Sequence, residues 1–239
     1  MKRLNIILLF ASFMCLITGC IGNKGNTLES YDVGTLLNVN GKLCIKGDNV
    51  KLFLTGAGLP EFTENSITRC FCTFMIDWDD QPEDAYAIGV YNAKINVESK
   101  WETENYLPNI GLPFTGSDSL INISKPYIVN VLNTPIITFQ TSTYFSDSPV
   151  YQLAVDNVDI AKKVVMIDFV YSAGQNVNKD IKTIQWRSYK LPAFTQDYTL
   201  VFQFKSFTKP AFTHTIYSDP IDIKKNAYRF NINYKATAK

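Results

Sequence analysis

The stretch Tyr228-Arg229-Phe230-Asn231-Ile232-Asn233-Tyr234-Lys235 has an aromatic or aliphatic residue at every second position and a polar residue between each pair. Side chains of a β-strand point alternately to opposite faces, so this period of two predicts a strand with one apolar and one polar face. The segment Tyr198–Phe204 alternates in the same way, with one face made of Tyr198, Leu200, Phe202 and Phe204. Both stretches therefore predict half-buried strands and not helices.

The period of two runs through most of the chain, and helical periodicity is nearly absent. Over residues 127–239 it predicts seven or eight strands, a number and spacing typical of a β-sandwich. Over residues 31–105 it predicts five or so shorter strands, which suit a small OB-type barrel. Residues 106–126 are predicted to be the linker between these domains, because turn-forming residues gather there: Pro108, Gly111, Pro113, Gly116 and Pro126. The expected fold class is thus all-β.

Local signals specify three segments of the first half. Asn40-Gly41 lies between the apolar runs Val33–Val39 and Lys42–Lys46, and Asn-Gly in that position predicts a two-residue hairpin. Thr68–Asp77 has apolar residues on both faces, which predicts a strand in the centre of a sheet. Tyr86–Val97 alternates as well and is predicted to be one strand.

The first twenty residues predict export. A basic start, Lys2-Arg3, precedes a mainly apolar run and then small residues, which is the order found in secretory signals. The run ends in Leu16-Ile17-Thr18-Gly19-Cys20, which resembles the bacterial lipobox. We therefore expect residues 1–19 to be removed as a lipoprotein signal peptide and Cys20 to carry lipid on its thiol. Residues 20–30 show no periodicity and are predicted to be a lipidated tether.

Charge and length exclude some classes of protein. Removal of residues 1–19 from 239 leaves 220, enough for one large or two small domains. Two of the 23 basic residues leave with the signal, so 21 basic residues face 22 acidic ones, a net charge of −1. Without a basic block, binding to nucleic acid is not expected. The signal is shorter than the roughly 20 apolar residues of a membrane span, so the lipid is the expected contact with the membrane.

Three cysteines remain after the signal and the lipid site are set aside: Cys44, Cys70 and Cys72. An exported protein can form disulfides, and three thiols allow one at most. Cys70 and Cys72 are two residues apart on one strand face, where a bridge would be strained. A disulfide from Cys44 to Cys70 or Cys72 is easier, and three free, half-buried thiols are the alternative. The spacing matches no zinc site, so no metal or other cofactor is expected.

No pattern in the sequence identifies a reaction, so no catalytic residue is assigned. The single histidine, His214, lies in an alternating stretch, and no Gly-x-Ser-x-Gly motif accompanies it. The acidic turn of residues 77–84 offers oxygen ligands for calcium but lacks the spacing of an EF-hand, and a solvated turn is the preferred interpretation. The remaining candidate is a ligand platform of Trp101 and Trp78, because sugar faces stack on aromatic rings.

The order of these features resembles the NigD-like lipoproteins of Bacteroidota. In the first half, the resemblance runs through Arg69-Cys70-Phe71-Cys72-Thr73-Phe74 and the Asp79-Asp80 turn. In the second half it runs through Val150–Val155, Val164–Gly174, Thr183–Leu191 and Tyr198–Phe202. The chain departs from the family at Val170-Tyr171-Ser172-Ala173, where an Arg-His-Asn-type sequence is common. The resemblance implies an OB-type domain, a β-sandwich and a cell-envelope address, with no established reaction.

We therefore expect a non-enzymatic envelope lipoprotein that acts by binding a protein or assembly partner. The alternative is a glycan-binding surface lipoprotein that serves polysaccharide uptake. Residues 21–26 lack the acidic cluster that often marks surface lipoproteins of Bacteroidota, and no Asp follows Cys20. These two features favour the outer membrane, with the body of the protein on the periplasmic face and not on the cell surface.

Overall fold

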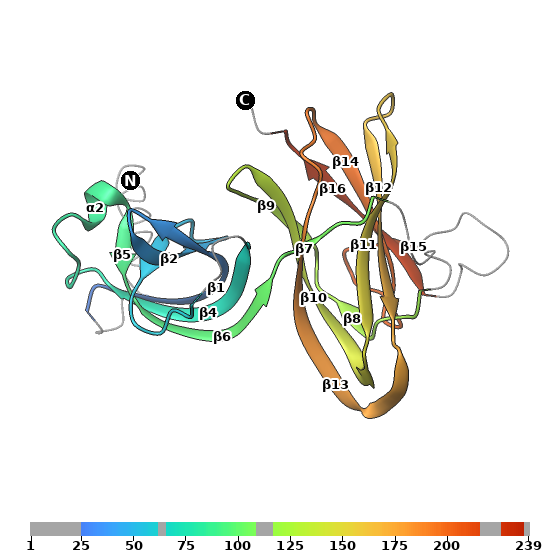
Figure 1. Cartoon of the computed structure of the whole chain (residues 1–239), viewed down its shortest axis with the longest axis horizontal. Helices are drawn as coiled ribbons and strands as arrows, with labels where there is room; N and C mark the ends of the chain where they lie inside the picture. The colour runs from blue at the N-terminus through green and yellow to red at the C-terminus, as the bar shows by residue number, and fades with distance from the viewer. Residues whose placement is uncertain (1–24, 62–65, 109–116, 216–225, 237–239) are drawn as a thin grey trace, which may run out of the picture. The chain divides into compact units, whose positions relative to one another are not determined.

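The computed structural model describes residues 25–61, 66–108, 117–215 and 226–236 and shows a nearly all-β chain with three mixed sheets (Figure 1). The chain divides into two compact units. The N-terminal unit consists of residues 1–61 and 70–99, and the C-terminal unit of residues 62–69 and 100–239. Two strands, β4 (Thr68–Asp77) and β6 (Lys94–Glu102), contribute residues to both units.

The N-terminal unit contains one six-stranded sheet in the order β5-β3-β2-β1-β4-β6. Its other strands are β1 (Thr27–Val39), β2 (Lys42–Gly47), β3 (Phe53–Thr55) and β5 (Val90–Asn92). Strands β5 and β6 are the two edges of this sheet, so hydrogen bonds do not close it, and the described residues form no closed barrel. One stretch of chain, interrupted only at Ala93, supplies both edges.

The local signals of the first half have different outcomes. Asn40 and Gly41 both have positive φ, 52° and 80°, and Val39 faces Lys42, so the predicted hairpin is confirmed. Strand β4 lies between β1 and β6, as its two apolar faces predicted.

The single strand predicted over Tyr86–Val97 is wrong. The structure has a short helix there, α2 (Ala85–Ile88), followed by β5 and β6. Gly89, with φ 68°, ends the helix, and its N–H donates to the carbonyl of Ala85 at 2.8 Å. A left-handed residue at this point suits glycine and stops a helix, whatever the alternation of the neighbouring side chains.

The C-terminal unit contains two five-stranded sheets. One has the order β7-β13-β10-β8, with β9 also paired to β10, and the other has the order β11-β12-β14-β16-β15. The strands of the first sheet are β7 (Glu104–Asn105), β8 (Asn122–Ile123), β9 (Tyr127–Val131), β10 (Thr134–Asp147) and β13 (Gln175–Lys190). Those of the second are β11 (Val150–Asp159), β12 (Val164–Ser172), β14 (Tyr198–Lys205), β15 (His214–Thr215) and β16 (Ala227–Tyr234).

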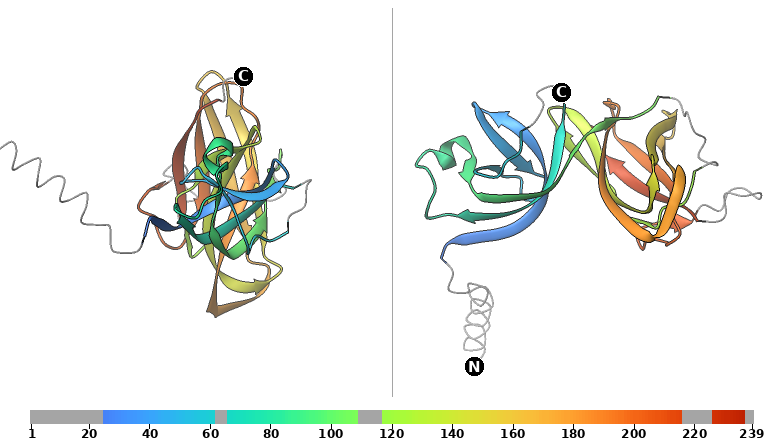
Figure 2. Two further views of the ribbon diagram at one scale, coloured as in Figure 1. Left: turned by 90° about the vertical axis from the view of Figure 1, so that its left-hand side faces the viewer. Right: turned by 60° about the horizontal axis from the view of Figure 1, so that its bottom comes forward.

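The two sheets of the C-terminal unit lie face to face (Figures 1 and 2). One apolar core contains residues of both sheets. The ring of Phe139 on β10 lies 4.8 Å from that of Phe169 on β12 and 5.2 Å from that of Phe202 on β14. Each aromatic pair of this kind adds about 0.5–1.5 kcal/mol to the gain from burial alone. The alternation in Tyr198–Phe204 thus follows the burial seen in the structure, since its four large apolar residues all lie in this core.

The described residues of the segment 106–126 are hydrogen bonded within the C-terminal unit. Leu107 N donates to Leu153 O at 2.8 Å, and Leu107 O accepts from Val155 N at 3.2 Å. Leu120 is fully buried, and its N–H donates to Lys205 O at 3.0 Å. The division between the units falls upstream, between Ser99 and Lys100, while residues 109–116 lie outside the described residues. Prolines and glycines are common at strand edges and turns as well as in linkers. Composition alone therefore does not distinguish a linker between domains from a turn within one.

Candidate functional site

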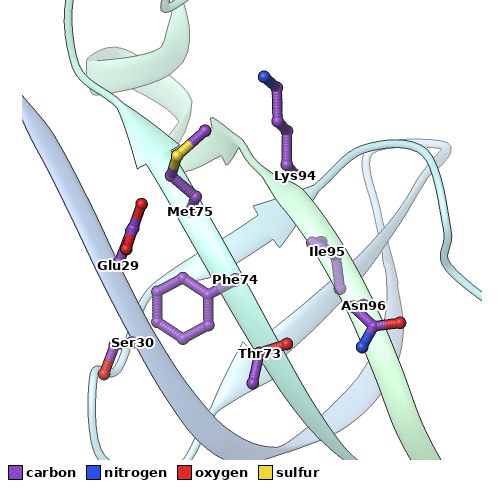
Figure 3. A pocket seen from close by; sticks show the side chains of 8 residues that line it. All are labelled: Glu29, Ser30, Thr73, Phe74, Met75, Lys94, Ile95 and Asn96. Carbon is purple, nitrogen blue, oxygen red and sulfur yellow. The ribbon is translucent and has the colours of Figure 1, made fainter.

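A hollow of about 520 Å³ lies over three neighbouring strands of the N-terminal unit, β1, β4 and β6 (Figure 3). Three of its lining residues are apolar, the buried Phe74 and Ile95 and the partly exposed Met75. Polar side chains complete the lining: Glu29, Ser30, Thr73, Lys94 and Asn96. In Figure 3, Glu29 and Lys94 lie on opposite sides of Met75, so the groove carries both signs of charge. Its volume is in the range of ligand-binding clefts, which are apolar with a few polar groups.

Three aromatic rings form what we call the aromatic corner of this unit: Trp78, Tyr86 and Tyr91. The ring of Tyr91 lies 5.4 Å from Trp78 and 5.6 Å from Tyr86, in both cases edge to face. Trp78 directly follows β4, Tyr86 lies on α2 and Tyr91 on β5. Tyr86 is 65% exposed, which leaves most of its ring open to solvent. Met75 and Trp78 are three residues apart, so the corner adjoins the segment of β4 that lines the groove.

The side-chain amide of Gln81 forms hydrogen bonds with the two backbone segments that carry Trp78 and Tyr91. Its Nε2 donates to Asp77 O at 2.6 Å and to Asn92 O at 3.0 Å. Its Oε1 accepts from Asn92 N at 2.8 Å. On the other side, Trp78 N donates to Asn26 O at 2.8 Å, and Asn26 Nδ2 donates to Asp79 Oδ1 at 3.3 Å.

The corner carries negative charge. The segment of residues 77–93 has no Lys or Arg and holds five acidic residues: Asp77, Asp79, Asp80, Glu83 and Asp84. All except Asp77 are exposed, which suits the solvated turn preferred from the sequence. Among the described residues, no group of three or more His, Cys, Asp or Glu side chains is arranged to hold a metal ion.

Trp101, the other member of the predicted platform, belongs to the C-terminal unit. Its ring stacks on Trp186 with the ring centres 5.7 Å apart and the planes 9° from parallel. Its Nε1 donates to Ser188 Oγ at 2.9 Å. One ring face and the N–H of Trp101 are therefore used inside its own unit, while Trp78 has its own ring partner in the N-terminal unit. The sequence reasoning missed Tyr86 and Tyr91, and the helix stop at Gly89 was the available signal for the turn that joins them.

The C-terminal unit has a cluster of contacts around Arg187 and a second hollow. The guanidinium of Arg187 lies 3.7 Å from the ring centre of Tyr151, its Nη1 donates to Glu104 at 3.1 Å and its Nη2 donates to Gln185. These contacts pair the charge of Arg187 within the fold. A second hollow of about 320 Å³ has mainly apolar walls, among them Tyr144, Tyr171, Val177 and Phe207.

Among the described residues of the N-terminal unit there are three cysteines, Cys44, Cys70 and Cys72, and all are buried free thiols. The thiol of Cys70 donates to Gly34 O at 3.8 Å. Interaction with the side chain of Cys70 lowers the pKa of the Cys72 thiol, while burial raises the pKa of Cys44. The structure thus brings Cys70 close to Cys72, and Cys44 makes its hydrogen bond to Lys42 O at 3.5 Å. A disulfide from Cys44 stays a prediction. Cys20 lies outside the described residues. Among the described residues, no helix is long and apolar enough to cross a membrane.

Comparison with known proteins shows a shared fold and no more. No protein-family model and no curated protein matches the sequence. A protein of unknown function from Bacteroides vulgatus is similar in structure, with a TM-score of 0.57 and 10% identity over 88% of this chain and 92% of that one. An uncharacterized protein from Parabacteroides merdae is similar with a TM-score of 0.53 and 13% identity over 86% of this chain and 98% of that one.

A NigD-like immunity protein from Bacteroides caccae also aligns, over 79% of this chain and 90% of that one, with 10% identity and a TM-score of 0.45. The fold is shown by the similarity to the Bacteroides vulgatus and Parabacteroides merdae proteins, while membership of the NigD-like family is not shown by sequence.

Proposed function

We propose that this chain is a non-enzymatic lipoprotein of the cell envelope that acts by binding a protein partner through the groove and the aromatic corner. In this proposal, lipid on Cys20 holds it at the outer membrane, with its body in the periplasm. The observation that carries the proposal is the combination, in one unit, of a groove over β1, β4 and β6 with two exposed aromatic rings, Tyr31 on β1 and Tyr86 on α2. We further propose that the N-terminal unit is an OB-type domain and that the C-terminal unit is a β-sandwich. We also propose that the protein is related to the NigD-like lipoproteins.

The chemistry of the surface suits a protein partner. Tyrosine and tryptophan are enriched where binding energy concentrates in protein interfaces, and charged groups at the rim add specificity. Besides Tyr86, Tyr31 on β1 is 69% exposed and has its ring 6.0 Å from that of Phe71 on β4. A partner that covered these rings would bury a large aromatic area next to Glu29 and Lys94.

The aromatic corner also supports the alternative, glycan binding. Sugar faces pack on aromatic rings, and side chains such as Asn92 and the exposed carboxylates offer partners for hydroxyl groups. This alternative would require the protein to face the outside of the cell.

Site-specific cross-linking tests the proposal. A photo-reactive amino acid at Tyr86 or at Met75, in the groove, should give a discrete protein adduct in cells of the source organism. The matched control is the same amino acid at Ile160, which is 67% exposed in the C-terminal unit and should give no such adduct. Equal adducts at all three positions, or none at Tyr86 and Met75, would contradict the proposed site. Saturable binding of a purified polysaccharide that Tyr86→Ala abolishes would favour the glycan alternative instead.

A further inference from the structure

The Gln81 side chain bonds to the two backbone positions that flank the aromatic corner. Asp77, whose carbonyl accepts from Gln81 Nε2, is the residue directly before Trp78. Asn92, whose carbonyl and N–H both bond to the same amide, is the residue directly after Tyr91. One amide group thus links the two segments whose rings are 5.4 Å apart.

The bonding pattern imitates a strand. The amide pairs with both the N–H and the C=O of Asn92, as a neighbouring β-strand would, and uses its second N–H for Asp77. Other bonds also restrain the loop between β4 and α2. Trp78 N donates to Asn26 O at 2.8 Å and Asp79 N to Asp77 Oδ1 at 3.1 Å, and the loop has two internal main-chain bonds, Asp80 N to Asp77 O at 3.4 Å and Ala85 N to Pro82 O at 2.9 Å. The side-chain bonds of Gln81 join this loop to β5.

Glutamine is the one side chain whose chemistry fits this place. The site needs two N–H donors and one acceptor at the end of a two-carbon side chain. A glutamate has the same shape but, when ionised, has no donor and would face two carbonyl oxygens. An asparagine is one carbon shorter, and a methionine of similar length has neither donor nor acceptor of comparable strength.

We propose that Gln81 is a positioning residue, which sets the relation of Trp78 to Tyr91 and thereby shapes the surface that the partner meets. The inference rests on the proposed function for its biological consequence, but the positioning itself is a property of the free protein. Gln81 itself contacts no partner and acts only through the position of the two rings.

The test uses the mature protein with Gln81→Glu and Gln81→Met. Nuclear Overhauser effects between the indole of Trp78 and the ring of Tyr91 should be strong in the parent and lost in both variants near neutral pH. In Gln81→Glu they should return in part near pH 4, about the ordinary pKa of glutamic acid, because a protonated carboxyl regains one donor. The parent is measured at both pH values. The control is Gln196→Glu, which removes a single amide bond, to Tyr198 Oη at 2.9 Å, in the C-terminal unit.

Partner binding provides the second measurement. Cross-linking from position 86 should be about tenfold weaker in Gln81→Glu than in the parent, as expected when one well-placed interaction is lost. Unchanged ring-to-ring effects in both Gln81 variants would overturn the positioning role whatever the partner does. Loss of the ring contacts with unchanged cross-linking would instead support the positioning role and contradict the aromatic corner as the binding site.

Discussion

At the scale of single residues, two buried carboxylates, those of Asp32 and Asp168, differ in their hydrogen bonding. Asp32 is buried, but its two oxygens accept hydrogen bonds from Asn49 N at 2.9 Å, Asn49 Nδ2 at 2.7 Å and Val50 N at 3.0 Å. Asp168 is 5% exposed, and its Oδ1 has no hydrogen-bond partner. A buried charge is tolerated when several donors replace water and is costly when they do not. The two residues therefore lead to opposite predictions.

Replacement of Asp32 by alanine should destabilise the N-terminal unit. The change removes the acceptor for two main-chain N–H groups of the turn between β2 and β3 and leaves them without a partner. We expect the free energy of unfolding to fall by about 2–4 kcal/mol, measured by urea denaturation. The matched control, Asp80→Ala, alters an exposed carboxylate and should change stability by less than about 0.5 kcal/mol. Similar losses in both variants would show that the bonds of Asp32 contribute little.

Replacement of Asp168 by asparagine should stabilise the protein at neutral and alkaline pH. Burial, together with the nearby charge of Asp156, raises the pKa of Asp168 from 3.8 to about 6. The folded state thus binds this proton more tightly than the unfolded state, so the free energy of unfolding falls as pH rises from about 4 to 6. A shift of roughly 2 units corresponds to ~3 kcal/mol, which is the order of the gain expected for Asp168→Asn at about pH 8.

The measurement is the free energy of unfolding of parent and Asp168→Asn across this pH range. The difference should shrink as pH approaches 4, because the parent carboxyl is then neutral in both states. A difference that is independent of pH would show that Asp168 does not carry the predicted charge penalty.

At the scale of elements, the turns decide where strands begin and end. The hairpin of β1 and β2 turns through two residues of positive φ, Asn40 and Gly41, and this conformation matches the twist of the flanking strands. The segment after Gln81 shows the opposite case, in which a helix of four residues and a left-handed glycine interrupt an alternating pattern. Local backbone conformation therefore overrides side-chain alternation in this segment.

Replacement of Gly41 by valine should weaken the hairpin through backbone strain alone. A Cβ at this position would meet no atom within 4 Å, so no clash is expected, but φ is 80°. L-residues lose about 1–2 kcal/mol in this conformation, and a comparable fall in the free energy of unfolding is expected. Asn38→Val, at an exposed position on the same β1 strand, is the control and should be close to neutral. An unchanged stability for Gly41→Val would show that the turn adapts without cost.

At the scale of the whole molecule, the lipid on Cys20 is the expected link to the membrane. Cys20→Ser removes the thiol to which lipid attaches, so the variant should move from the membrane fraction to the soluble fraction on cell fractionation. One acyl chain gives only marginal binding, so the parent is expected to carry more than one. A variant that stays fully membrane-bound would contradict the proposed anchor.

The side of the membrane distinguishes the two proposed functions. Protease added to intact cells should leave the protein uncut, because the sequence after Cys20 favours the periplasmic face, and lysis should expose it to cleavage. A periplasmic protein of known location serves as the control for intact membranes. Digestion without lysis would place the protein on the surface and favour glycan binding over a periplasmic protein partner.

Much of the strand framework follows from the sequence by itself. Period-two alternation located β4, β14 and β16 to within one or two residues, because each strand has at least one face against a core and the pattern is local. The Asn40-Gly41 hairpin was equally local. The expected lipid on Cys20 also rests on sequence alone and awaits its test.

Only the tertiary structure decided the pairing and the site. The open edges of the N-terminal sheet depend on which strands meet, and the membership of residues 117–126 in the C-terminal unit depends on distant partners such as Lys205. The candidate site follows the same rule. Trp78 was predicted as part of a ligand platform because it is a tryptophan. Its ring neighbours Tyr86 and Tyr91 are 8 and 13 residues away in the sequence. They meet Trp78 because Gln81 and the turn at Gly89 bend the chain back on itself, and bonds between a side chain and the backbone leave no periodic trace in a sequence.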